Sequence, residues 1–347
     1  MSSSAQPVHS NPSPSSALGF WFIDAIRRSV GRLEPDRARA LGARWGRRAS
    51  FMGGSVTDLS RINLQLAFPE ESVAFRQNVL EQSFQNLGMG VAELALLQGP
   101  HREHVLDGVR LEGEENLDRP GGGPSEGGAL IVTAHFGTWD LYAAAIARRY
   151  PLTVIHRGFK NERITEMMTR VRHAGGGDLE EVRMGPRAVT GLLGALRRGR
   201  YCILLMDQNA RREEGVFTPF FSRLACTRSA PAVVAMRRGV PVYPVFGHRE
   251  GRSGRHRVCI GSPLAIEAVT PEDGIEAFEA ALKRNVGRMT SAIEEAISRH
   301  PDQWVWSQRR WKTRPDAPDA DAASFYPSRS GWGRSLRRRW RSMRRAE

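Results

Sequence analysis

The sequence is short of lysine, cysteine and long apolar runs. Lysine makes up only three of the 51 basic residues, a bias that a GC-rich coding sequence explains. The three cysteines are odd in number and lack CxxC spacing, which argues against a disulfide or zinc framework and favours the reducing cytoplasm. The apolar stretch at residues 17–23 falls far below the roughly 18 to 20 residues of a bilayer-spanning helix, and residues 1–16 lack the regions of a secretory signal.

The excess positive charge lies at the two ends of the chain. Residues 1–50 carry +5 and residues 329–347 carry +7 of the total of +14, so the 278 residues between them are almost neutral. A near-neutral body argues against a fold that is itself a nucleic-acid platform. The arginines of residues 329–347 alternate with Trp332 and Trp340, which suits an anionic membrane surface. An Arg-rich nucleic-acid-binding protein is the alternative from another class, because tryptophan also stacks on bases.

Changes in composition divide the chain into four regions. We expect a disordered Ser/Pro-rich segment at 1–17 and a helical, membrane-associating region at 18–103. An α/β domain follows at 104–315, and a linker with a basic amphipathic tail at 316–347. Within the second region, the spacing at 18–32 predicts an amphipathic basic helix, which either lies in a membrane interface or packs as a core helix with solvated arginines.

The region from residue 104 to 315 alternates between strand and helix patterns. This order predicts an α/β fold in which helices cover a central mixed β-sheet on both faces. The expected strands lie at 104–113, 129–134, 152–157, 201–207, 240–248 and 256–264. The expected helices lie at 161–174, 187–198, 229–238 and 272–299.

Three of the expected strands end in residues that can do chemistry, namely His135, Arg157 and the pair Asp207 and Gln208. In open α/β sheets, ligands bind beyond the carboxyl ends of the strands. His135 stands in the bend before a helix whose first turn contains Asp140, so the carboxylate can meet the imidazole and hold it as a general base. Because HxxxxD is common by chance, a helix-capping histidine beside a surface aspartate is the competing interpretation.

The sequence lacks the common motifs for a serine nucleophile, a catalytic zinc or a nucleotide phosphate. GxSxG, HExxH and the P-loop pattern are all missing. A histidine base without a protein nucleophile favours direct attack of a substrate hydroxyl on an activated carbonyl.

Five ordered motifs resemble those of the bacterial late acyltransferases of lipid A biosynthesis, a branch of the glycerolipid acyltransferase superfamily. They are GGALIVTAHFGTWDLYA, VIHR, LRRGRYCILLMDQNARREEGVFTPFF, RRGVPVYPVF and HPDQWVWSQRRWKTRP, which together run from about residue 105 to about 315. The resemblance implies that His135 is the catalytic base and Asp140 the acidic member of the HxxxxD/E signature. It implies substrate-binding roles, toward a phosphate, a carboxylate or the acceptor, for Arg157, Asp207, Gln208, Arg309 and Arg310.

The same resemblance implies an activity and a location. The donor is an acyl thioester of acyl carrier protein or coenzyme A, and the acceptor is a hydroxyl of a lipid A precursor. A phosphatidylinositol mannoside or an aminolipid is the alternative acceptor. Neither a metal nor a bound cofactor is implied. Members of this family often carry an N-terminal hydrophobic helix; here we expect the two basic ends to hold the protein peripherally on the cytoplasmic face of the inner membrane.

Overall fold

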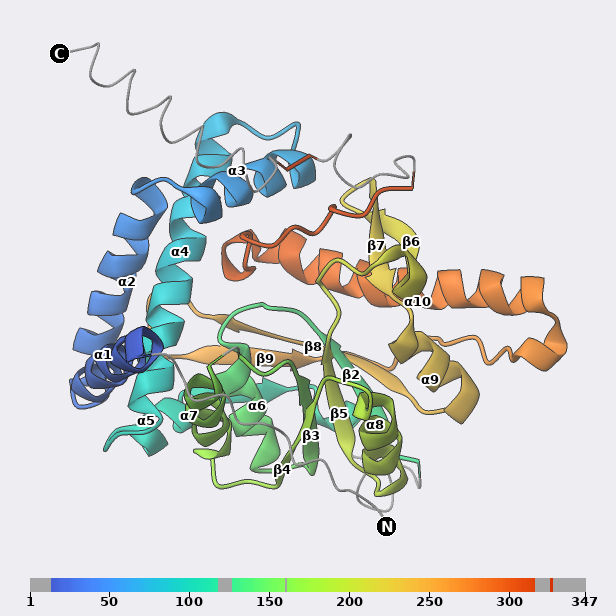
Figure 1. The fold of residues 1–347 in the computed structure, drawn as a ribbon, viewed down its shortest axis with the longest axis horizontal. Helices are drawn as coiled ribbons and strands as arrows, with labels where there is room; N and C mark the ends of the chain where they lie inside the picture. Colours follow the sequence, from blue (N-terminus) through green and yellow to red (C-terminus); the bar gives the residue numbers. More distant parts are fainter. Residues whose placement is uncertain (1–13, 118–126, 160, 316–324, 327–347) are drawn as a thin grey trace.

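The computed structural model describes residues 14–117, 127–159, 161–315 and 325–326. The described chain begins with a group of helices (Figure 1). They are α1 (Pro14–Val30), α2 (Pro35–Phe51), α3 (Ser55–Ala67), α4 (Val73–Leu96) and α5 (Arg102–Asp107). Within the described ranges, none of the helices has both the length and the apolar character needed to cross a bilayer.

The helices α2 and α4 touch backbone to backbone. Gly46 in α2 meets the carbonyl of Phe84, where an added Cβ would lie 2.0 Å from the oxygen. Gly88 in α4 meets the carbonyl of Gly42 in the same way, at 2.1 Å. Glycine is therefore required at this crossing. The close contact fixes α4, another side of which forms a wall of the site described below.

A seven-stranded mixed sheet forms the centre of the molecule, in the order β1-β9-β8-β2-β5-β3-β4. All neighbouring pairs are parallel except β8 and β9. The strands are β1 (Val109–Glu112), β2 (Ala129–Thr133), β3 (Leu152–His156), β4 (Leu179–Arg183), β5 (Tyr201–Leu205), β8 (Val242–Arg249) and β9 (His256–Ile260). A separate antiparallel hairpin joins β6 (Gly215–Phe220) to β7 (Arg223–Arg228).

Helices cover both faces of the sheet, and β2 shows why. All five of its residues are buried, as a strand between two layers requires. Leu130 and Val132 belong to the core that includes residues of α8, α9 and α10, whereas Ala129 and Ile131 belong to the core that includes α6 and the end of α4. The helices of these layers are α6 (Trp139–Ala147), α7 (Glu162–His173), α8 (Ala188–Arg197), α9 (Ala230–Arg238) and α10 (Ile275–Arg299).

The predicted α/β fold with a helical N-terminal region is confirmed, with local corrections. The first part of the strand expected at 104–113 is the helix α5, and the strand begins only at Val109. The strands β4, β6 and β7 were not expected. Segments 1–13 and 327–347, which include the basic tail, lie outside the described residues.

Candidate active site

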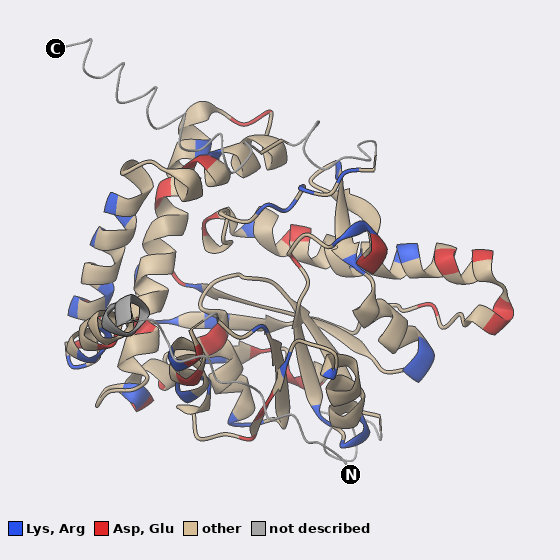
Figure 2. Cartoon of the chain, viewed as in Figure 1, with Lys and Arg blue, Asp and Glu red and all other residues tan. Residues whose placement is uncertain are grey.

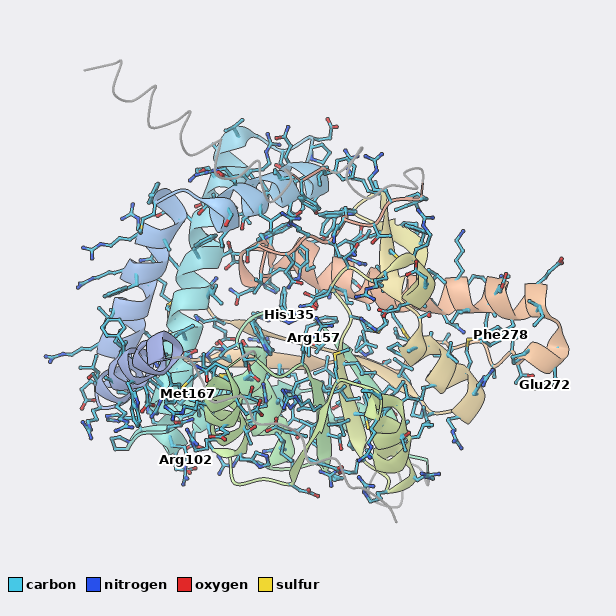
Figure 3. All side chains as sticks on the ribbon, viewed as in Figure 1. Arg102, His135, Arg157, Met167, Glu272 and Phe278 are labelled. Atoms are coloured by element: carbon cyan, nitrogen blue, oxygen red, sulfur yellow. The ribbon has the colours of Figure 1, made fainter. Side chains whose placement is uncertain are left out.

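The carboxyl ends of the parallel strands β2, β5, β3 and β4 open into one cavity of about 600 Å³. His135 follows β2, Gln208 follows β5 and Arg157 follows β3, and all three line this cavity. Figure 3 shows His135 and Arg157 close together near the middle of the molecule. Most of the remaining wall is apolar and comes from α4, α7 and the residues after β3 and β4. The structure therefore brings these three predicted residues together at one cavity.

The imidazole of His135 is held by Asp207. Nδ1 of His135 lies 2.9 Å from Oδ1 of Asp207, and the main-chain N–H of His135 donates to Oδ2 at 3.0 Å. Oδ2 also accepts from Nε1 of Trp304 at 2.8 Å and from Nε2 of Gln308 at 3.2 Å. Asp207 is fully buried, while 23 % of the His135 side chain remains exposed. The buried, hydrogen-bonded carboxylate of Asp207 thus faces Nδ1 of the His135 ring, and part of the ring remains exposed.

This pairing shifts the pKa of both groups toward their charged forms. Burial lowers the pKa of His135, but the charge and hydrogen bond of Asp207, with a smaller contribution from the charge of Asp140, raise it above its ordinary value. Burial raises the pKa of Asp207, but the charge of His135 and the hydrogen bonds from His135 and Trp304 lower it below its ordinary value. Asp207 therefore stays ionised at neutral pH and stabilises an imidazolium.

The second ring nitrogen of His135, Nε2, contacts a residue of the cavity wall. Nε2 lies 3.3 Å from the amide nitrogen of Gln208, a residue that lines the cavity. An ionised carboxylate can only accept hydrogen bonds, so the proton of neutral His135 lies on Nδ1 and Nε2 carries the lone pair. That is the tautomer that a general base needs.

Asp140 has a different partner from the one the sequence predicts. No hydrogen bond joins it to His135; instead Oδ1 of Asp140 accepts from Nε of Arg172 at 2.8 Å. Arg172 lies on α7 and also donates to Glu181 of β4 at 2.7 Å. The reason is geometric, because Asp140 lies inside α6 and faces the neighbouring α7, while His135 remains in the bend before α6. Asp140 lines the cavity but acts on His135 only through its charge.

The segment that follows α10 completes the site. Phe136 and Trp304 form an antiparallel bridge, Val305 N–H donates to the carbonyl of His135 at 3.0 Å, and Gly137 N–H donates to the carbonyl of Gln303 at 2.8 Å. Trp304 also binds Asp207. The two members of the pair are therefore held from behind by one stretch of chain that lies about 100 residues or more further along the sequence.

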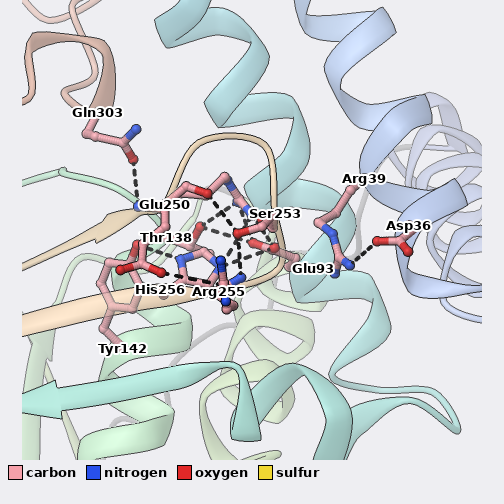
Figure 4. Close-up of polar contacts among 11 residues, drawn as sticks. Asp36, Arg39, Glu93, Thr138, Tyr142, Glu250, Ser253, Arg255, His256 and Gln303 are labelled. Atoms are coloured by element: carbon pink, nitrogen blue, oxygen red, sulfur yellow. Dashed lines mark hydrogen bonds and ion pairs between the residues drawn. The ribbon is translucent and has the colours of Figure 1, made fainter.

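A second, fully buried cluster of charges braces the turn after His135 (Figure 4). Glu93 of α4 forms a bidentate ion pair with Arg249 of β8, and His256 of β9 lies 3.1 Å from Glu93. Both charged groups of the pair also contact the hydroxyl of Thr138 at 3.4 Å. The main-chain N–H of Arg249 donates to the side chain of Gln303. The cluster thus contacts both the turn at Thr138 and the segment after α10, through Gln303.

Comparison of the sequence with known proteins shows the family of this chain. The family described as bacterial lipid A biosynthesis acyltransferase matches residues 12–313. The chain belongs to this family. It is 26 % identical to the lipid A biosynthesis palmitoleoyltransferase of Escherichia coli K12, over 79 % of this chain and 85 % of that one. It is 25 % identical to the myristoyltransferase of the same strain, over 85 % and 87 %, and 24 % identical to a lipid A biosynthesis acyltransferase of Haemophilus influenzae, over 86 % and 91 %.

The basic residues that the sequence predicts to bind substrate have different surroundings. Arg157 lines the cavity, is exposed, and forms no hydrogen bond or ion pair with any described residue. Arg310 is completely buried, and its guanidinium donates to the carbonyl of Cys226 and the hydroxyl of Thr227. Burial lowers the pKa of Arg310 to about 10. Neither Arg310 nor the half-buried Arg309 lines the cavity, so the structure does not bring these two predicted residues together with His135 and Arg157.

Sequence reasoning missed the residues that organise the site from a distance. Trp304 was not among the predicted site residues, yet its N–H donates to Asp207, the carboxylate that holds His135. Arg172 and Glu93 were not singled out, because each lies in a helix with no local motif around it. A buried charge in an otherwise apolar helix stretch, as at Glu93, is the one signal that could have drawn attention to it.

Proposed function

We propose that this acyltransferase moves a fatty acyl chain from an acyl thioester, carried by acyl carrier protein or coenzyme A, to a hydroxyl of a lipid A precursor or a similar glycolipid. The observation that carries the proposal is the His135–Asp207 pair opening into a largely apolar cavity of about 600 Å³. Such a cavity is large enough for an acyl chain and a reacting head group.

The reaction proceeds by general-base catalysis at Nε2 of His135. Nε2 takes the proton of the acceptor hydroxyl while that oxygen attacks the thioester carbonyl, and Asp207 stabilises the imidazolium through Nδ1–H. Collapse of the tetrahedral intermediate breaks the C–S bond, and Nε2 returns the proton to the thiolate. The products are an ester and a free thiol. The scheme uses the thioester as co-substrate and needs no bound cofactor or metal.

The cavity wall supplies groups for the developing negative charge. The first N–H groups of α6 belong to Trp139 and Asp140, which line the cavity, and a helix N-terminus favours negative charge. Arg157, which has no hydrogen-bond or ion-pair partner among the described residues, is suited to a phosphate or carboxylate of the substrate. The acceptor lipid is best identified by mass spectrometry of total lipids with and without the gene, which separates lipid A from a phosphatidylinositol mannoside or an aminolipid.

We further propose that the enzyme works at the cytoplasmic face of the inner membrane as a peripheral protein. The acceptor is a membrane lipid, and α1 leaves Trp21 and Phe22 more than half exposed. The basic segment 329–347 would add electrostatic attraction to anionic lipids, at about 1 kcal/mol per basic residue near the surface. Deletion of 329–347 should shift the protein toward the soluble fraction in low salt, and an unchanged distribution would contradict this role of the tail.

The decisive assay supplies an acyl thioester and detergent-dispersed lipid A precursor to the purified protein. His135→Ala should lose at least about 10²-fold in rate, because general-base help contributes about 10² to 10⁴. His104→Ala, at an exposed histidine of α5, is the matched control and should keep the wild-type rate. More than about a tenth of the wild-type rate in His135→Ala would refute the base assignment.

A further inference from the structure

The opening of the catalytic cavity is surrounded by exposed apolar side chains. Four residues both line the cavity and leave between 37 % and 62 % of their surface exposed. They are Leu87 and Val91 of α4, Phe159 after β3 and Met184 after β4, and together they are called the mouth rim. Large apolar side chains gathered around an opening mark a contact surface rather than ordinary scatter.

The exposed side of α1 is tied to the same opening. Arg163 at the start of α7 lies over the rings of Phe20 and Trp21, at 5.8 Å from each centroid. The N–H of Phe159 donates to Thr165 in the first turns of α7, at 2.9 Å. Hence α1 and the Phe159 side of the mouth rim are both attached to α7. In α1, Phe20 is buried, whereas the aromatic and aliphatic residues that follow it are 44 % to 69 % exposed: Trp21, Phe22, Ile23 and Ile26.

The size of the cavity indicates what lies against this surface. About 600 Å³ holds a ligand of drug size, which is less than a donor chain together with a glycolipid that already carries several chains. The rest of the acceptor must therefore stay outside the mouth. Its chains remain out of water only if the mouth lies against the leaflet.

We propose that the mouth rim and the exposed side of α1 form one surface that sits on an anionic bilayer, so that the acceptor enters the cavity directly from the leaflet. This inference rests on the proposed function. The charges fit the partner, because Arg157 at the mouth has no ion-pair partner among described residues and α1 ends in Arg27 and Arg28. The one acidic residue of α1, Asp24, is buried and neutralised by those two arginines. Aromatic and aliphatic groups beside arginines are typical of interfacial helices.

A competing membrane surface exists on α2 and makes the orientation testable. The outward side of α2 exposes several arginines, seen in blue at the left of Figure 2, together with Trp45 and Phe51. Neither Trp45 nor Phe51 lines the cavity. A protein that docked through α2 would bind vesicles equally well but would depend on different residues.

The test is co-sedimentation of the full chain with vesicles of phosphatidylethanolamine and phosphatidylglycerol. The variants Phe22→Ser/Ile26→Ser and Val91→Ser/Phe159→Ser should each lower the partition coefficient about tenfold or more, because apolar groups leave the interface. The matched control Val73→Ser/Ile275→Ser removes side chains that are 75 % and 63 % exposed but lie at the start of α4 and of α10. It should stay within about twofold of wild type.

The outcomes separate this inference from the proposed function. A loss in Trp45→Ser/Phe51→Ser with no loss in the rim variants would overturn the orientation. Rim variants that bind vesicles normally but lose affinity for an acidic acyl carrier protein would make that protein the partner and overturn the membrane surface. Transfer to detergent-dispersed acceptor without vesicle binding would refute the inference and leave the function standing. Vesicle binding without transfer from any thioester would refute the function instead. Phe22→Ser/Ile26→Ser should transfer acyl chains to detergent-dispersed acceptor as fast as wild type.

Discussion

The substitution Asp207→Asn tests the central pairing with almost no change in shape. Oδ2 of Asp207 accepts from the N–H groups of His135, Trp304 and Gln308, so the oxygen of an asparagine must occupy that place. The amide NH₂ then faces Nδ1 of His135 where Oδ1 stood at 2.9 Å. Because NH₂ donates, Nδ1 must accept, and the proton of neutral His135 moves to Nε2. With a proton on Nε2, His135 can no longer accept the proton of a substrate hydroxyl at that atom.

The expected loss is about 10³- to 10⁴-fold in kcat, the cost of holding a catalytic histidine in the wrong tautomer. The pH profile adds a second readout. His135 must be neutral to act, and its pKa is raised above the ordinary 6.5, so wild-type kcat/KM should rise with pH through a value above 6.5. Without the carboxylate, the residual activity should rise at a lower pH.

Asp140→Asn is the matched comparison. The sequence motif predicts that Asp140 pairs with His135, whereas in the structure Asp140 pairs with Arg172. We expect a smaller shift of the acid limb, because Asp140 raises the pKa of His135 by charge alone. Asp178→Asn, at an exposed carboxylate away from the cavity, controls for loss of a surface charge. The pairing would be refuted by an Asp207→Asn enzyme with more than about a tenth of wild-type kcat, or by an acid limb that moves in Asp140→Asn alone.

Three further predictions follow from single contacts. Arg157→Ala should raise KM for a phosphorylated acceptor about tenfold to a hundredfold with little change in kcat, and Arg157→Lys should recover part of it; an unchanged KM would remove Arg157 from the acceptor site. Trp304→Phe should lower the free energy of unfolding in urea by about 1.5 to 3 kcal/mol and slow turnover, and unchanged stability would mean that Asp207 does not need this donor. Burial raises the pKa of Glu93, but the charges of His256 and Arg249 and their hydrogen bonds lower it to about 2. The ionised Glu93 therefore contributes about 3 kcal/mol to the free energy of unfolding. This contribution is complete above pH 4.5 and is lost as the pH falls toward 2. Glu93→Gln should lose less stability than wild type between about pH 5.5 and about pH 3, and identical losses would contradict the shift.

The fold could be predicted because its main elements carry local patterns. The run at 129–134 is apolar throughout, and the strand there is buried on both faces. The strand β4 escaped prediction because LEEVR alternates poorly: Glu181 points inward to pair with Arg172 and His156. A strand whose inward residue is charged and paired with a distant element does not show the apolar alternation from which strands are predicted.

The sequence predicted several of the residues that the structure brings together at the cavity, but it did not predict their pairing. His135, Arg157 and Gln208 were expected at strand ends because parallel strands bring their carboxyl ends together. Which carboxylate meets His135 depends on the direction of side chains across 72 residues, and Asp140 is the nearer in sequence but faces α7. Arg310 lies in a basic stretch whose sequence suggests an exposed surface, and only the tertiary packing shows that its side chain is buried.

The bridge between Phe136 and Trp304 has a consequence for how the enzyme comes into being. A ribosome that has made β2, α6 and β5 has already produced His135 and Asp207, yet Asp207 gains its indole donor and His135 its strand partner only after residue 305 has emerged. Until then Asp207 lacks the hydrogen bond from Trp304, and the turn at His135 lacks the hydrogen bond from Val305. We therefore expect that a chain released before residue 305 lacks the supported His135–Asp207 pair.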